Sequence, residues 1–225
     1  MRVTSSSLPA ADGSRRSRGR PAVPLDRILA TAVQLVDEEG AEALSMRTLA
    51  QRLESGTATL YRHFGNRATL ITHVIDRVFG EVDLDAASLA GLSWDQACRT
   101  VAQAMFEALG RHRRIAPLLI EQTPTGPNAM LLRERCLAVL LDGGFPPDLA
   151  ARAYATLARY VLGFAIQLTG SGNDAEQARA HFHQVSPGEF PATLAVADSL
   201  PVPLEDEFAF GLELIVNGLR QLHAR

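Results

Sequence analysis

The sequence predicts an all-α fold, in which a small N-terminal three-helix domain containing a helix-turn-helix precedes a larger helical domain. Apolar residues recur at intervals of three and four along most of the 225-residue chain, which is the periodicity of amphipathic helices. No segment alternates convincingly between apolar and polar residues, as a strand does, and no repeat of about 20 to 50 residues appears. We expect nine or ten helices in all.

The charge is unevenly distributed, although a hydrophobic content of 47% is that of a globular protein. Residues 1–80 hold eleven Arg and eight acidic residues, a formal charge of +3, whereas residues 81–225 hold eleven Arg and seventeen acidic residues, a charge of −6. Positive charge at the front of the chain indicates a surface suited to nucleic-acid phosphates. Every basic residue is Arg, whose forked guanidinium binds phosphate oxygens well.

The cysteine content and the hydropathy indicate the compartment. Cys98 and Cys136 are too few for a disulfide framework or a zinc site, which fits a reducing cytoplasm. No apolar run approaches the ~18 residues of a membrane span, and residues 1–20 lack the apolar core of a signal peptide. We therefore expect a cytoplasmic protein, and nothing in the sequence indicates a metal or a cofactor.

Residues 1–23, MRVTSSSLPAADGSRRSRGRPAV, contain five Arg and one Asp among Ser, Gly and Pro. This composition offers too little apolar surface to offset the loss of chain entropy, so we expect a disordered basic arm. The candidates in it for following nucleic acid are Arg15, Arg16, Arg18 and Arg20. A solvated tail without function is the alternative, and it is favoured for residues 1–13.

Residues 24–80 are predicted to form a helical domain. Its helix boundaries coincide with residues that favour helix starts and stops, namely Pro24, Gly40, Ser45 and Asn66. Two of its helices, over residues 46–53 and 57–64, are separated only by a break at residues 54–56. A helix, a short turn and a second helix form a helix-turn-helix.

The second of these helices, TATLYRHF at residues 57–64, has one apolar side. Leu60 and Phe64 lie four residues apart and stack on one face, where they can anchor the helix. The other faces present small or polar side chains from Thr57, Ala58, Thr59, Tyr61, Arg62 and His63. A recognition helix needs such an anchor, and short side chains that reach base edges and phosphates in the major groove of DNA. An ordinary amphipathic surface turn is the alternative.

Residues 81–225 are predicted to form a second helical domain. Ser93 is placed to cap a helix that runs to about Leu109. Further helices are expected over residues 115–122, 128–141, 147–168, 174–183 and 204–222. Prolines at positions 187, 191, 201 and 203 indicate a loop before the last of them. Two of these helices carry little charge and are candidates for a subunit interface, with core packing as the alternative.

Several of these segments resemble one family. LSMRTLAQRL, TATLYRHF and GNRATL, within residues 25–80, resemble the second helix, the recognition helix and the start of the fourth helix of the tetracycline-repressor (TetR) family. LLDGGFPPDLAARAYATLARYVLGFAIQL and FAFGLELIVNGL resemble the effector domain of the branch nearest the tetracycline repressor itself. The resemblance implies a sequence-specific transcriptional repressor that a small-molecule ligand, bound in the C-terminal domain, releases from its DNA operator.

The resemblance also implies a homodimer. In the family, two helices from each subunit form a four-helix bundle, to which residues 154–168 and 208–222 would contribute here. Gly163 and Gly218 would permit the helices to approach closely. A dimer suits the helix-turn-helix, because two recognition helices about 34 to 36 Å apart read two half-sites of one operator.

Within the helix-turn-helix, the resemblance assigns roles to individual residues. It implies base-edge contacts for Arg47, Thr57 and Thr59, and a methyl contact with a base for Ala58. It implies phosphate contacts for Thr48, Tyr61, His63 and Arg67, whereas the contact of the outward-pointing Arg62 stays unassigned. The turn departs from the family, because Glu54, Ser55 and Gly56 stand where Gly, an aliphatic residue and a cap are common. We therefore expect strain in the turn and a lower DNA affinity.

The helices over about residues 93–142 surround a ligand cavity in this family, and the resemblance implies the same here. The candidate ligand contacts combine adaptable apolar surface with a few polar groups, as a small-molecule pocket requires. They are Trp94, Met105, Phe106, Leu109, Leu118, Gln122, Met130 and Cys136. For each of them, packing in an ordinary core is the alternative.

Three other kinds of function have less support. An enzyme is disfavoured because the chain has no G-x-S-x-G, no phosphate-binding glycine loop and no H-E-x-x-H, and His181 and His183 lie on different sides of a helix. A redox sensor would use Cys98 and Cys136 in place of a ligand, with nearby arginines lowering a thiol pKa. A nonspecific architectural DNA protein is disfavoured by the −6 charge of residues 81–225, which repels the duplex.

Overall fold

The computed structural model of the chain describes residues 23–82, 84, 86–168 and 172–223. Over these residues the structure is helical and contains no strand, which confirms the predicted all-α class. The basic arm expected over residues 1–23, with Arg15, Arg16, Arg18 and Arg20, lies outside the described residues apart from Val23.

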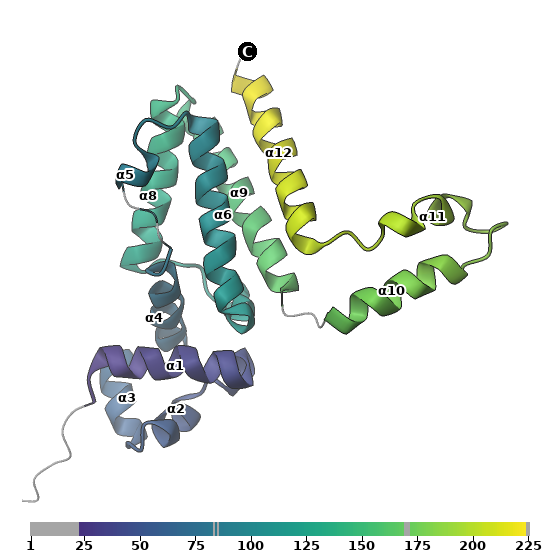
Figure 1. The fold of residues 1–225 in the computed structure, drawn as a ribbon. Helices are drawn as coiled ribbons and strands as arrows, with labels where there is room; N and C mark the ends of the chain where they lie inside the picture. Colours follow the sequence, from purple (N-terminus) through teal and green to yellow (C-terminus); the bar gives the residue numbers. More distant parts are fainter. Residues whose placement is uncertain (1–22, 83, 85, 169–171, 224–225) are drawn as a thin grey trace, which may run out of the picture.

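Four helices build the N-terminal part: α1 (Leu25–Glu39), α2 (Met46–Arg52), α3 (Thr57–Phe64) and α4 (Arg67–Phe79). Figure 1 shows α1, α2 and α3 grouped at one end of the molecule, with α4 rising from them into the rest of the protein. The 3.6-residue period of each helix turns one apolar stripe inward. The fully buried side chains at the centre of these stripes include Ile28, Leu35, Leu49, Leu60 and Leu70, and Leu44, from the segment between α1 and α2, belongs to the same core.

The helix ends of this part lie where the capping residues predict them. Ser45 caps α2 by accepting a hydrogen bond from the backbone N–H of Thr48 at 3.0 Å. Asn66 caps α4 in the same way, with the backbone N–H of Thr69 at 2.9 Å. Gly40 ends α1 with a φ of +96°, a conformation that costs glycine little because it has no Cβ. Such contacts satisfy backbone groups that a helix end leaves unpaired.

The larger part contains α5 (Ala86–Leu89), α6 (Trp94–Arg111), α7 (Ala116–Glu121), α8 (Pro127–Asp142), α9 (Pro147–Gln167) and α12 (Leu204–His223). α6, α8 and α9 pack against one another, and α12 packs on α6 and α9 (Figure 1). Ser93 caps α6 in a reciprocal capping box with Gln96, as its sequence position predicts. No helix of the described residues is long and apolar enough to cross a membrane.

Two further helices, α10 (Gly172–Gln184) and α11 (Pro191–Ala195), project from the body (Figure 1). They pack on each other and on the 3-10 turn Ala197–Ser199. α10 covers the helix expected over residues 174–183, whereas α5 and α11 lie where no helix is predicted from the sequence. α11 begins at Pro191, one of the prolines that predict a loop. Proline is tolerated in the first turn of a helix because the N–H that it lacks would be unpaired there.

Candidate DNA interface and effector cavity

The outward side of α3 is an exposed polar surface at one end of the molecule. Leu60 and Phe64 are 0% and 2% exposed and fasten α3 to the neighbouring helices, whereas Tyr61 is 52% exposed. The other side chains of this surface are exposed or, for Thr59, half-buried, and they belong to Thr57, Ala58, Thr59, Arg62 and His63. The structure therefore brings all the contact residues expected on α3 to the side of the helix that faces away from its core.

The first turn of α2 lies beside α3 and contributes two more of the expected contact residues. Arg47 is exposed, and neither Arg47 nor Arg62 forms an ion pair within the described part of the chain. Thr48 is half-buried, and its hydroxyl lies 2.8 Å from the Ser45 hydroxyl. Arg47 can reach toward DNA from this position, while Thr48 already takes part in the cap of its own helix.

Arg67, at the start of α4, is held by two contacts inside the protein. Its Nε donates to the Leu44 carbonyl at 2.8 Å, and its Nη1 lies 2.6 Å from Oε2 of Glu121 at the end of α7. The side chain is 39% exposed. Arg67 therefore links the helix-turn-helix to the larger part, and a phosphate contact would compete with Glu121 for its guanidinium.

In the turn between α2 and α3, Glu54 stands where the family commonly has a glycine. Glu54 has a φ of +49°, and among the described residues it is the one non-glycine with a positive φ. The left-handed conformation costs an L residue roughly 1 to 2 kcal/mol. The backbone N–H of Ser55 donates to the Ala50 carbonyl at 2.9 Å, and the Ser55 hydroxyl is buried without a hydrogen-bond partner in the described structure. The strain expected from the sequence is therefore present in the backbone of the turn.

His112, which follows α6, joins the two parts of the molecule between two carboxylates. Its Nδ1 lies 2.8 Å from Oδ2 of Asp37 on α1, and its Nε2 lies 2.8 Å from Oε2 of Glu81, just beyond α4. Burial lowers the pKa of His112, but the hydrogen bonds to Glu81 and Asp37 together outweigh it and raise that pKa above its usual value. Both bonds are satisfied only by an imidazolium, which carries a proton on each nitrogen.

Asp76 forms a second junction, where α4 meets the start of α8. Its carboxylate is buried and accepts hydrogen bonds from the Asn128 side chain at 3.1 Å and from the backbone N–H of Ala129 at 3.0 Å. Asp76 thus caps α8 from outside, where a carboxylate also suits the positive end of the helix dipole. The Gly126 backbone lies so close that an added Cβ would be 2.3 Å from the carboxylate of Asp76. α4 is therefore fixed to the cavity-forming helices.

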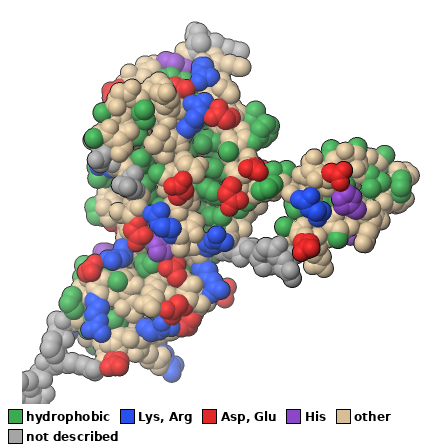
Figure 2. Space-filling view, viewed as in Figure 1, with side chains coloured by type: hydrophobic (Ala, Val, Ile, Leu, Met, Phe, Trp, Pro, Cys, Tyr) green, Lys and Arg blue, Asp and Glu red, His purple; other side chains and the backbone are tan. Residues whose placement is uncertain are grey.

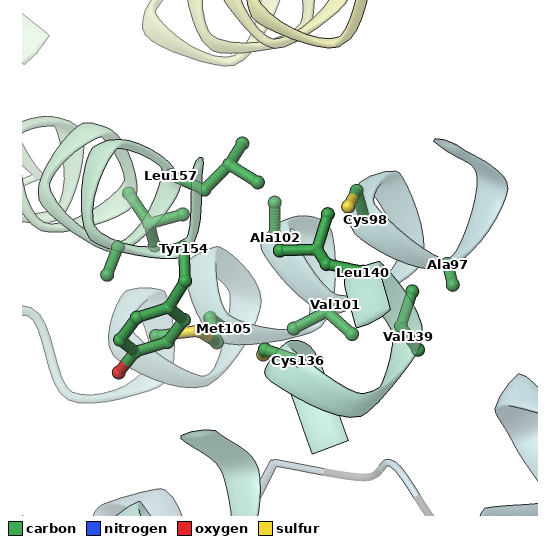
Figure 3. Close-up of a pocket in the computed structure, with 12 residues that line it drawn as sticks. Ala97, Cys98, Val101, Ala102, Met105, Cys136, Val139, Leu140, Tyr154 and Leu157 are labelled. Atoms are coloured by element: carbon green, nitrogen blue, oxygen red, sulfur yellow. The ribbon is translucent and has the colours of Figure 1, made fainter. Parts of the chain in front are cut away.

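The space between α6, α8 and α9 is a narrow apolar inner cavity of about 30 Å³, which is room for about two water molecules. Figure 3 shows Cys98, Ala102 and Met105 from α6, Cys136, Val139 and Leu140 from α8, and Tyr154 and Leu157 from α9 around it. Val101, Val161 and two alanines, Ala97 and Ala158, complete the wall. No charged side chain lines this cavity.

An outer cavity, of about 900 Å³ including its open side, adjoins the inner one. Met105, Tyr154 and Ala158 line both. Its remaining wall residues are Phe79, Leu109, Leu119, Thr123, Pro124, Ala129, Arg133, Ala155, Arg159 and Leu162. Phe79 is the last residue of α4. The helix that connects the recognition helix to the body therefore also forms part of the cavity wall.

Three of the eight expected ligand contacts, Met105, Leu109 and Cys136, line these cavities. The other five lie elsewhere. Trp94 packs on Phe145 with ring centroids 4.8 Å apart, and Phe106 stacks on Phe208 at 4.2 Å. Leu118 lies in the core, Gln122 lies at the end of α7, and Met130 lies on the surface.

The cavity walls include residues that are not among the predicted ligand contacts, because the prediction from the sequence limits the cavity to about residues 93–142. α9 contributes Tyr154 and Arg159 from beyond that window. Arg133 and Cys98 fall inside the window but were not among the expected contacts. One sequence signal could have pointed to α9, since Arg159 is an isolated charge in a run of otherwise uncharged residues.

The two thiols of the inner cavity are poorly suited to redox sensing. Burial raises the pKa of Cys98 to about 11, helped by Asp95, and the opposing effect of Arg99 is smaller. Burial likewise raises the pKa of Cys136 to about 12. The thiolate is the reactive form, and it is scarce at neutral pH when the pKa is this high. The described residues also contain no group of three or more His, Cys, Asp or Glu side chains that could hold a metal.

An exposed recognition helix joined by a single helix to a domain with an apolar cavity is the architecture of a one-component DNA-binding regulator. Two family models match the chain: that of the bacterial regulatory proteins of the tetR family over residues 28–74, and that of the tetracyclin repressor-like C-terminal domain over residues 89–223. The second match covers more than half of the chain. The chain therefore belongs to the TetR family of transcriptional regulators and carries the tetracycline-repressor-like C-terminal domain.

Individual relatives agree with this assignment. The chain is 32% identical to the HTH-type transcriptional repressor DrrR1 of Streptomyces coeruleorubidus over 227 residues, which cover 95% of this chain and 83% of that protein. It is 32% identical to ActR of Streptomyces coelicolor, whose apo structure gives a TM-score of 0.81 over 91% of this chain and 98% of that one. ActR bound to actinorhodin gives 0.80, over 90% and 100%. These proteins are transcriptional regulators, and the comparisons give no support to an enzyme or a redox sensor.

Proposed function

We propose that the chain acts in the cytoplasm as a homodimeric repressor, which binds an operator through residues 24–80 and is released by a small molecule bound within residues 81–225. One observation carries the proposal: α4 starts beside the recognition helix and ends at Phe79 in the wall of the outer cavity. A ligand that favours another position of α4 would move the recognition helix. ActR, which shares the fold and has been solved with actinorhodin, supports a ligand-responsive regulator.

The DNA contacts follow from the surface of α3 and the first turn of α2. We assign base reading to Arg47, Thr57 and Thr59, with Ala58 offering a methyl group. We assign phosphate contacts to Thr48, Tyr61, His63 and Arg67, and a DNA contact to Arg62. The exposure of α3 and the family resemblance support these assignments. In the basic arm, Arg15, Arg16, Arg18 and Arg20 are proposed to follow the DNA backbone.

The exposed face of α12 supports a dimer. Phe210 is 66% exposed and Leu214 is 58% exposed, and Figure 2 shows hydrophobic side chains gathered over α12 on the side toward the projecting helices. Such a patch on a regulator suits an interface between subunits. A Cβ added at Gly163 or at Gly218 would meet no atom within 4 Å in one protomer, so a second copy has room to approach both glycines.

Release requires that the ligand bind two conformations of the dimer with different affinity. A ligand that binds more tightly to the conformation with wrongly spaced recognition helices lowers the affinity for DNA. The largest decrease that it can cause is set by the ratio of its affinities for the two conformations. Of the ligand contacts expected from the sequence, Met105, Leu109 and Cys136 are retained in this proposal because they line the cavities.

Footprinting of the purified protein on DNA that flanks its own gene tests the proposal, at two salt concentrations and beside three variants. Protection of a near-palindrome is expected. Arg47→Ala should relax base preference at one position in each half-site by about 1 to 3 kcal/mol, and Arg62→Ala should weaken binding to all sequences and lower the salt slope by about 1. Arg67→Ala separates two roles, because a phosphate contact changes the salt slope whereas a purely structural link to Glu121 leaves it unchanged.

The control for these variants is Arg152→Ala, on an exposed side of α9 where Arg152 pairs with Asp148 at 2.7 Å. It should leave the footprint unchanged. If the wild-type protein protects nothing at low salt, and selection from whole genomic DNA also yields no site, the repressor function is wrong.

A further inference from the structure

The outer cavity carries two arginines and no acidic residue. Arg133 from α8 and Arg159 from α9 are its charged wall residues, and the inner cavity has none. Some arginines of the same part of the molecule pair with carboxylates, as Arg99 and Arg220 do, and others, such as Arg111 and Arg135, bind backbone carbonyls. What distinguishes Arg133 and Arg159 is that both line one cavity wall that contains no acidic residue.

Arg133 is held in place by neutral acceptors. Its Nε donates to the Tyr154 hydroxyl at 3.1 Å, its Nη2 to the Pro124 carbonyl at 3.1 Å, and its Nη1 to Sδ of Met130 at 2.7 Å. The guanidinium carbon also lies 5.8 Å from the centroid of the Tyr154 ring. Within the described residues no carboxylate comes within ion-pair distance of Arg133, although its side chain is half-buried. Its charge is thus oriented but not neutralised.

Arg159 likewise has no carboxylate partner among the described residues, and it is more exposed than Arg133. It is exposed, and its recorded contact is a weak hydrogen bond from Nη1 to the Ala155 carbonyl at 3.4 Å within its own helix. It forms no ion pair with a described residue. A partly buried positive charge without a counter-ion is costly, and an anionic ligand removes that cost by forming a charge-assisted hydrogen bond.

The wall shared by the two cavities suggests how such a ligand lies. Tyr154 accepts a hydrogen bond from Arg133, which leaves its own proton available for a ligand oxygen. Apart from Arg133, Arg159, Thr123 and the Tyr154 hydroxyl, the outer cavity is lined by apolar side chains, among them Met105, which also borders the inner cavity. A flat apolar ring suits this lining, because the Met105 thioether packs well against aromatic edges.

We infer that the effector is a ring-bearing organic anion, whose acidic group binds Arg133 and Tyr154, with Arg159 nearby, while its apolar rings lie in the outer cavity against side chains such as Met105 and Leu109. This inference rests on the proposed function, because it describes the ligand of the same cavity. It adds the charge and the polarity of the ligand, which the apolar lining alone would not specify.

Two fluorescent probes with the same rings test the inference on the full-length protein. 1-Anilinonaphthalene-8-sulfonate carries an anionic group, and N-phenyl-1-naphthylamine lacks it. The anionic probe should bind at least several-fold more tightly than the neutral one. Arg133→Gln should weaken the anionic probe about tenfold and change the neutral probe less than twofold, while Arg133→Lys should retain part of the binding. Arg159→Gln should have a smaller effect of the same kind, and Arg152→Gln, whose Arg lies outside both cavities, should have none.

Ala158→Phe locates the probe, because Ala158 lines the outer cavity and a phenyl ring there takes up part of its space. Both probes should then bind weakly. The inference is overturned if the neutral probe binds as tightly as the anionic one, if Arg133→Gln leaves the anionic probe unaffected in a folded protein, or if Ala158→Phe leaves it bound. Footprinting decides the proposed function separately: a repressor released only by neutral ring compounds keeps the function and refutes the charge of the ligand.

Discussion

The recognition surface and the effector cavity are built in opposite ways. The surface of α3 comes from eight consecutive residues, Thr57–Phe64, whose inward anchors and outward polar groups follow directly from the helical period. The cavity walls come from α4, α6, α7, α8 and α9, which are brought together by packing. A local pattern therefore encodes the first region, and only the tertiary structure encodes the second.

The two regions also differ in how they carry charge. Arg47 and Arg62 stand exposed on the surface proposed to bind DNA, where solvent screens their charges. Arg133 lies half-buried in a cavity wall among neutral acceptors. Loss of an exposed arginine should lower the affinity for DNA without disturbing the fold. A change at the half-buried Arg133 should affect both ligand binding and the packing of the cavity wall. α4 links the two regions, and polar contacts at Asp76 and His112 hold it.

The largest effect is expected from breaking the α4–α8 junction with Asp76→Ala. The change leaves two donors, the Asn128 amide and the backbone N–H of Ala129, without their buried acceptor. We expect the free energy of unfolding to fall by about 2 to 3 kcal/mol, measured by urea denaturation. Asp76→Asn keeps one acceptor oxygen and should lose less. Equal stability of wild type and Asp76→Ala would show that α4 is not anchored here and that the cavity and the recognition helix are less firmly joined than the contacts suggest.

A smaller, pH-dependent effect is expected at His112. Its pKa is raised in the folded protein, so its contribution to stability is present below the usual His value of about 6.5 and is lost as the pH rises through the folded pKa. Wild type should therefore exceed His112→Gln in unfolding free energy by about 1 kcal/mol at pH 6, and by less at pH 9.

Urea denaturation of both proteins at several pH values checks this, and other histidines cancel in the difference. A difference that grows with pH would mean that His112 is neutral when folded, so that one of its two contacts is not a charged hydrogen bond.

The smallest effect is expected at Glu54, in the turn before the recognition helix. Glu54→Gly removes left-handed strain but adds freedom to the unfolded chain, so stability should rise by only a few tenths of a kcal/mol. Operator affinity should rise about two- to threefold, because a negative charge near the phosphates is lost. Glu54→Gln, which removes the charge and keeps the strain, should reproduce the gain in affinity but not the gain in stability. If neither variant binds DNA more tightly, Glu54 lies too far from the phosphates to matter.

Much of the fold and of the DNA surface could be predicted from the sequence. Ser45, Asn66 and Ser93 cap the helices that their positions predict, because a cap acts on backbone groups only a few residues away. The short helices α5 and α11 were missed, since a proline such as Pro191 is compatible with both a loop and a helix start. Arg67 shows the limit on the DNA side: its position suggests a phosphate contact, whereas the folded protein pairs it with Glu121, 54 residues away.

The sequence by itself thus determined the helical class, the helix-turn-helix and the outward face of TATLYRHF, because helix period and capping depend on residues within one or two turns. Only the tertiary structure decided which apolar residues are cavity wall and which are core. Phe106 and Met105 are neighbours on α6, yet one stacks on Phe208 and the other lines both cavities. Their roles depend on which helix packs opposite each of them, and that partner lies far away in the chain.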